Sequence, residues 1–93
     1  MKYIKKFNEL YSKGDIMTVG ELKALKTGDY IHLEYYNDEG NRVCNSFKKL
    51  NIINNHIDAE AFPIPIERYS DDVLIQNLDN SGYTFTVRYA NIV

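Results

Sequence analysis

The sequence has no second cysteine to pair with Cys44, which excludes a small secreted scaffold held together by disulfide bonds. It has no apolar run near the ~18–20 residues of a membrane-spanning helix, and residues 1–10 carry three lysines without the apolar centre of a signal peptide. Nucleophile elbows, phosphate-binding glycine loops, HExxH and CxxC patterns are also missing. We therefore expect a cytoplasmic, non-enzymatic protein without a cofactor or membrane association, in which Cys44 is a small buried strand residue.

Length and charge narrow the class further. At 93 residues, 44% hydrophobic and 26% charged, the chain suits one globular domain and is too apolar for intrinsic disorder. Residues 1–50 hold nine basic against seven acidic side chains, whereas residues 51–93 hold two against six. Neither half has the basic excess typical of nucleic-acid-binding proteins. The many Asn, Ile, Lys and Tyr residues, which have AT-rich codons, favour a low-GC bacterial or bacteriophage genome.

Two helical segments are expected at the start of the chain. Apolar residues recur at helical spacing over residues 1–13, which predicts an amphipathic helix with Gly14 at its C-terminal cap. Thr18 followed by Glu21 is a capping-box pattern and predicts a short helix over residues 19–25. The apolar residues of the first stripe are Tyr3, Ile4, Phe7, Leu10 and Tyr11.

Met17 carries a second hypothesis about the chain. The codons of the Lys-Gly-Asp sequence shortly before it can spell a ribosome-binding site, so Met17 is a candidate alternative start. Residues 1–16 would then be an upstream helical segment, and residues 17–93 would be the compact core of a single 1–93 domain. The apolar stripe of the first segment argues against this hypothesis, because the translation of a random leader sequence would seldom show one.

From residue 30 onward the apolar pattern alternates with a period of two. Strands are predicted over residues 30–36, over 42–53 as one bent strand or two, and over 56–62 after an Asn54-Asn55 turn. Residues 63–65 contain two prolines and should lie at an edge or in a linker. Residues 70–78 fit a helix or a strand, and we favour the strand because residues 83–89 complete a hairpin.

These elements predict an α+β, mainly β fold. The N-terminal helical segments would precede a five-stranded antiparallel, half-open small barrel of SH3-like or OB-like type. The final strand would leave an unpaired edge, so a homodimer joined through that edge is a further expectation.

The leading functional hypothesis is a protein-interaction module, for example a bacteriophage or mobile-element accessory or inhibitor protein. Tyrosines on a sheet face give rigid contact area with a polar tip, and clustered carboxylates can occupy a basic groove on a partner. The binding face is therefore expected on the polar side of the first strand or in the acidic region that follows the prolines. These two sets are Tyr30, His32, Glu34 and Tyr36, and Glu67, Asp71, Asp72 and Asp79.

Two alternatives belong to other classes. Lysines beside tyrosines can bind single-stranded nucleic acid in a small barrel, although the net charge of −2 opposes this. Alternate residues His56, Asp58 and Glu60 of one strand carry metal-ligand side chains, which is the weakest hypothesis, that of a metal-dependent or hydrolytic protein. The candidate nucleic-acid residues are Lys2, Lys5, Lys6, Lys13, Lys48 and Lys49.

Overall fold

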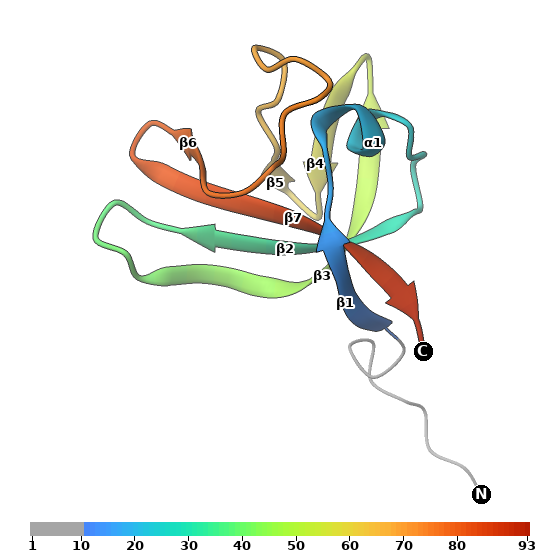
Figure 1. Ribbon diagram of the computed structural model, residues 1–93, viewed down its shortest axis with the longest axis horizontal. Helices are drawn as coiled ribbons and strands as arrows, with labels where there is room; N and C mark the ends of the chain where they lie inside the picture. The colour runs from blue at the N-terminus through green and yellow to red at the C-terminus, as the bar shows by residue number, and fades with distance from the viewer. Residues whose placement is uncertain (1–10) are drawn as a thin grey trace, which may run out of the picture.

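A computed structural model of the chain describes residues 11–93, and more than half of these residues lie in β-strands. The strands form one antiparallel sheet in the order β1-β7-β2-β3-β4-β5, and β6 also pairs with β7 (Figure 1). Within the described range, no helix is long and apolar enough to cross a membrane. In chain order the elements are β1 (Tyr11–Ile16), α1 (Val19–Lys23), β2 (Tyr30–Tyr36), β3 (Arg42–Ile53), β4 (His56–Ala59), β5 (Phe62–Pro63), β6 (Leu78–Asn80) and β7 (Tyr83–Ile92).

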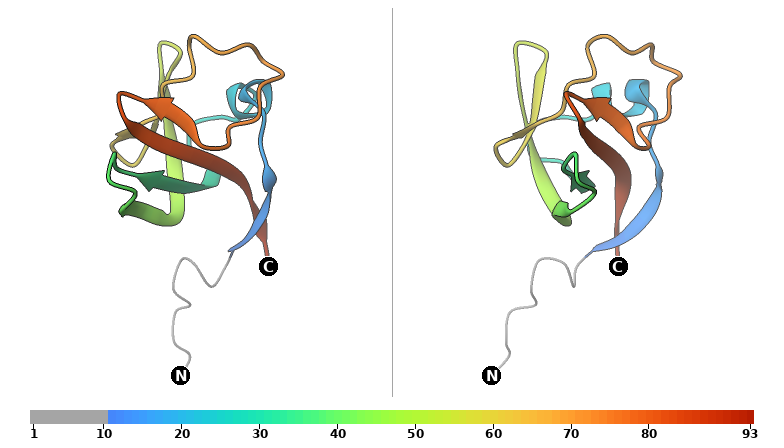
Figure 2. Two further views of the ribbon diagram at one scale, coloured as in Figure 1. Left: turned by 60° about the vertical axis from the view of Figure 1, so that its left-hand side comes forward. Right: turned by 90° about the vertical axis from the view of Figure 1, so that its left-hand side faces the viewer.

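The long strand β3 gives the sheet its curl. It is one strand of 12 residues, which settles the choice between one strand and two. Its residues up to Lys49 pair with β2, and residues 50–53 pair with β4. Figure 2 shows the β3–β4 hairpin standing up from the rest of the sheet on the side that carries α1.

The fold is mainly β, as predicted, but the five-stranded barrel is not confirmed. The sheet has seven strands, and no strand pairing within residues 11–93 joins β5 to β1 or to β6. One extra strand arises because Glu60 and Ala61 adopt positive φ angles of 50° and 78° and turn the chain after Ala59. The predicted 56–62 strand is thereby divided into β4 and β5, whose Pro63 lies at the sheet edge.

The predicted N-terminal helix is wrong for residues 11–13, and residues 1–10 lie outside the described part of the chain. Tyr11 and Lys13 pair with Ile92 and Ala90 at the end of β7, so β1 is an edge strand. Gly14 does not cap a helix: a Cβ atom there would lie only 2.9 Å from the Cβ of Tyr89. Helical spacing of apolar residues is overridden here by backbone pairing with the far end of the chain.

The capping box of α1 is confirmed. The amide of Thr18 donates to the Glu21 carboxylate at 2.8 Å, and the amide of Glu21 donates to the Thr18 hydroxyl at 3.1 Å. The Thr18 backbone donor, followed by the Tyr89 hydroxyl, holds the pKa of Glu21 below its usual value. The helix ends at Lys23, two residues earlier than predicted. It is therefore a single short turn-like helix that depends on its contacts with the sheet.

The hydrophobic core lies on the inner face of the sheet, beneath α1 and the loop between β5 and β6. The alternation predicted for β2 is confirmed, because Ile31, Leu33 and Tyr35 are all buried. Burying each large apolar side chain contributes about 1.5–3 kcal/mol, so these contacts dominate the stability of so small a domain. The other core residues are Met17, Val19, Leu22, Cys44, Leu50, Ile57, Ala59, Ile64, Ile66, Ile75, Phe85 and Val87.

Two tight turns confirm the sequence reading of the hairpins. Asn54 and Asn55 adopt φ angles of 52° and 69°, the left-handed conformation that a two-residue hairpin requires. In the last hairpin, Ser81 and Gly82 have φ angles of 56° and 91° and join β6 to β7. Asparagine and glycine tolerate this conformation better than most residues.

The strand favoured for residues 70–78 is wrong over most of its length. The structure has a loop up to Asn77 with one isolated bridge between Thr18 and Leu74, and only β6 is a strand. The amide of Ile75 donates to the Met17 carbonyl, and its carbonyl accepts from the Val87 amide. Because these bonds go to separate segments, they hold the loop against the core without forming a ladder.

Thr86 of β7 is polar but is not exposed to solvent. It is 4% exposed, because the amide of Asn77 at the end of the loop donates to its hydroxyl at 2.9 Å. Alternation along β7 placed it correctly on the face opposite Phe85 and Val87, but the loop covers it.

Candidate functional site

The tyrosine-bearing side of β2 is largely packed. His32, expected on a recognition surface, is only 2% exposed, and its ring lies edge-on to Phe47 with centroids 4.9 Å apart. Tyr30 and Tyr36 are half-buried, and the Tyr30 ring lies 5.1 Å from that of Tyr11. His32 therefore cannot contact a partner, and the predicted four-residue recognition face is reduced to its margins.

A small polar cluster surrounds His32. The Lys13 ammonium lies 3.6 Å from the Glu34 carboxylate. Burial lowers the pKa of His32, and the positive charges of Lys13 and Arg88 lower it further. The charge of Glu34 and a hydrogen bond with Asn45 act in the opposite direction but do not outweigh these effects. Nδ1 of His32 and Nε of Arg88 are buried and have no hydrogen-bond partner among the described residues. Burial and the neighbouring positive charges therefore disfavour the charged form of the imidazole.

The predicted acidic region does not form one patch. Asp79 lies on β6, where its carboxylate accepts from the Gly82 amide at 3.2 Å. Asp72 accepts from the Ser70 hydroxyl at 2.7 Å within the loop. Glu67 and Asp71, by contrast, lie beside a pocket that separates the loop from the β3–β4 hairpin. Of the two sequence-predicted binding faces, this part of the acidic region is the more exposed.

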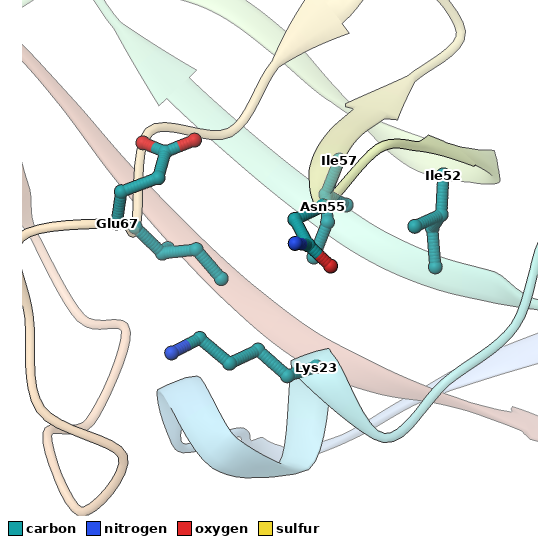
Figure 3. Close-up of a pocket in the computed structure, with 6 residues that line it drawn as sticks. Lys23, Ile52, Asn55, Ile57 and Glu67 are labelled. Atoms are coloured by element: carbon teal, nitrogen blue, oxygen red, sulfur yellow. The ribbon is translucent and has the colours of Figure 1, made fainter.

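The pocket has a volume of about 320 Å³ and lies between α1, the β3–β4 hairpin and the start of the loop (Figure 3). We call it the hairpin pocket. Its apolar lining comes from Ile52, Ile57 and Ile66, of which the last two are almost fully buried. Its polar lining comes from Lys23, Asn55 and Glu67.

Two ion pairs stand at the mouth of the hairpin pocket. The Lys23 ammonium lies 3.0 Å from the Asp71 carboxylate, and His56 Nδ1 lies 3.7 Å from the Glu67 carboxylate. In Figure 3 the Glu67 carboxylate points away from the Lys23 ammonium, so these two groups do not neutralise each other. Both pairs are exposed, and exposed pairs contribute only about 0–1 kcal/mol. The charged groups are therefore available to a ligand at little cost.

The structure holds this mouth in place through the backbone of α1. The Gly20 amide donates to the Asp71 carbonyl and the Val19 amide to the Val73 carbonyl, both at 2.9 Å. A Cβ atom at Gly20 would lie 3.0 Å from the Cβ of Asp71, so the loop approaches the helix closely where glycine leaves room. The loop is thus tied to α1 on one side of the pocket.

The lysines proposed for nucleic acid do not gather in one groove within the described chain. Lys48 lies over the Phe62 ring and 4.0 Å from Glu60, on the inner face of β3. Lys49 lies over the Tyr30 ring on the opposite face, and Lys13 pairs with Glu34. Lys2, Lys5 and Lys6 lie outside the described residues.

The proposed metal face is not assembled. Glu60 has left the strand for the turn after β4, where its carboxylate accepts from the Lys49 amide at 2.9 Å. His56 turns to Glu67 instead. Between residues 11 and 93, no three histidine, cysteine, aspartate or glutamate side chains come together as metal ligands would.

The hairpin pocket is the feature that sequence reasoning missed. Its isoleucines come from β3, from β4 and from the segment that joins the second proline to Glu67. No local sequence pattern predicts that these segments meet. The weak sequence signals for the pocket were Ile64 and Ile66, because an exposed linker beside the prolines has no need of two large apolar side chains. Comparison of the chain with protein-family models, with curated proteins and with solved structures finds no match. The chemistry of the site alone carries the functional argument.

Proposed function

We propose that the protein is a non-enzymatic protein-interaction module that binds its partner at the hairpin pocket. The observation that carries the proposal is an open pocket of about 320 Å³ with an isoleucine lining and a charged mouth. Ligand sites commonly combine an apolar body with a few polar groups that fix orientation. Here the two acidic residues Glu67 and Asp71, already candidates from the sequence, stand at that mouth.

The pocket favours binding over catalysis. Catalysis needs a nucleophile or a positioned acid and base beside the substrate. The titratable groups at the mouth are exposed ion pairs, and the groups lining the interior are isoleucines and the Asn55 amide. This arrangement can hold an apolar group and orient it, which is what a recognition site does.

The test is affinity capture from a lysate of the source organism with wild-type protein and two matched variants. Lys23→Trp places an indole over the pocket without altering a core residue, because the Lys23 side chain is 46% exposed. Lys26→Trp makes the same change three residues later, beyond the end of α1, at an exposed residue that does not line the pocket.

We expect one discrete partner whose capture is unaffected by nuclease treatment and by Lys26→Trp. The amount captured should fall at least about tenfold with Lys23→Trp. Circular dichroism of both variants should match wild type. Equal capture by the two variants would refute the pocket as the binding site. Recovery that disappears with nuclease would move the nucleic-acid hypothesis to first place, with its steep dependence on salt.

A further inference from the structure

The mouth of the hairpin pocket carries more negative than positive charge. Glu67 and Asp71 are exposed, whereas the facing helix contributes the Lys23 ammonium. Arg68 lies over the Tyr69 ring, 5.9 Å from its centroid, and the Tyr69 hydroxyl donates to the backbone carbonyl of Asp79 on β6. The basic residue that follows Glu67 in the loop is thus stacked on its neighbouring aromatic ring.

Glu67 in particular is left available to a positive ligand. Its described ion-pair partner is His56, an imidazole that carries charge only when protonated. The Asp71 side chain is 72% exposed, and its carboxylate pairs with one lysine, Lys23. A cation arriving at this mouth would meet at least one carboxylate that no permanent charge neutralises, and opposite charges across an interface also speed association.

The size and polar lining point to a polypeptide as the occupant. A volume of about 320 Å³ lies at the lower end of the ~300–1,000 Å³ range of ligand pockets, and suits one or two side chains better than a large cofactor. The Asn55 amide lies among the lining residues in Figure 3. It offers both a donor and an acceptor, which is what a peptide bond requires.

We propose that the hairpin pocket binds a linear segment of a partner protein in which an aliphatic side chain stands close to a lysine or arginine. The aliphatic side chain packs on Ile52, Ile57 and Ile66, and the basic side chain pairs with Glu67. This inference rests on the proposed function and adds the chemistry of the partner. The carboxylates at the mouth predict the sign of the partner's charge, and the isoleucine lining predicts its apolar side chain.

The experiment is selection from a library of random nine-residue peptides on wild-type protein, with counter-selection on Lys23→Trp to remove peptides that bind elsewhere. Individual synthetic peptides are then measured by fluorescence anisotropy against four proteins: wild type, Lys26→Trp, Glu67→Lys and Glu39→Lys. Glu39 is an exposed residue of the β2–β3 loop outside the pocket lining, so it controls for the change of net charge. Melting curves of all variants report whether each remains folded.

Support would be enrichment of peptides with an aliphatic residue near Lys or Arg, with affinity about tenfold weaker for Glu67→Lys and unchanged for Glu39→Lys. Pocket-dependent peptides that are neutral or acidic, or that bind Glu67→Lys as well as wild type, would overturn this inference and leave the proposed function standing. A selection that yields no pocket-dependent peptide would overturn both.

Discussion

Replacing Gly14 by Ala tests whether β1 is held against β7 by close backbone approach. Inside a strand, Gly→Ala ordinarily stabilises by about 0.5–1 kcal/mol because it restricts the unfolded chain. In this fold the new Cβ would lie 2.9 Å from the Tyr89 Cβ and 2.7 Å from the Asn91 side-chain nitrogen. The Asn91 side chain can rotate away, but the Tyr89 Cβ is fixed by the β7 backbone. The strand β1 must therefore move outward by a few tenths of an ångström or more.

The cost follows from the bonds beside Gly14. The pairs Lys13–Ala90 and Ile16–Arg88 flank it, and the Met17 amide donates to the Val87 carbonyl at 2.9 Å just beyond. Weakening two such bonds costs about 1–3 kcal/mol, since each contributes about 0.5–1.5 kcal/mol net. Subtracting the ordinary gain from the middle of that range leaves an expected loss of about 1 kcal/mol. For a domain of this size that lowers Tm by about 4–8 °C.

Urea and thermal denaturation followed by circular dichroism measure the effect. Ser12→Ala, at an exposed residue of the same strand, is the matched control and should change stability by no more than about 0.5 kcal/mol. A Gly14→Ala protein as stable as wild type, or more stable, would show that β1 does not cross β7 at this distance.

Three further outcomes are expected. The folded state holds the pKa of His32 below its usual value, so the unfolded chain binds the proton first as the pH falls. The free energy of unfolding should therefore decrease as the pH drops below about 6.5. In urea denaturation at a series of pH values, His32→Phe should weaken this dependence. Thr18→Ala removes the cap hydroxyl of α1 and should cost about 1 kcal/mol in urea denaturation, whereas no change would mean that the cap is not formed in solution. Phe85 is 1% exposed, so Phe85→Ala should lower the free energy of unfolding by about 3–5 kcal/mol. This is a large share of the stability of a small domain, so circular dichroism should show a substantial unfolded population at 25 °C. A near-native melting curve would contradict the place of Phe85 in the core.

Features that depend on neighbouring residues were predictable. The capping box needs only Thr18 and Glu21, three residues apart, and it forms as expected. The turn at Asn54 and Asn55 needs only two residues that tolerate a left-handed backbone. The buried side of β2 follows from strict alternation, because side chains of a strand point to opposite faces in turn.

Features that depend on what lies across the fold were not predictable from local pattern. Residues 11–13 fit the end of a predicted helix, yet they lie in a strand because β7 offers them a backbone partner. His32 reads as an exposed polar residue, yet Phe47 from the next strand packs on it. Glu60 reads as a strand residue, but a positive φ angle turns its carboxylate toward the Lys49 amide.

The candidate site divides in the same way. A small, mainly β domain with acidic residues clustered after its prolines was predictable, because composition, charge and the alternation of apolar residues can be read from short stretches of sequence. That Glu67 lines a pocket, with Asp71 paired to the lining residue Lys23, depends on the tertiary structure. The lining comes from α1, the β3–β4 hairpin and the segment after β5, which are far apart in the chain. A pocket is the space left between packed segments, and that space depends on every contact that fixes their relative positions.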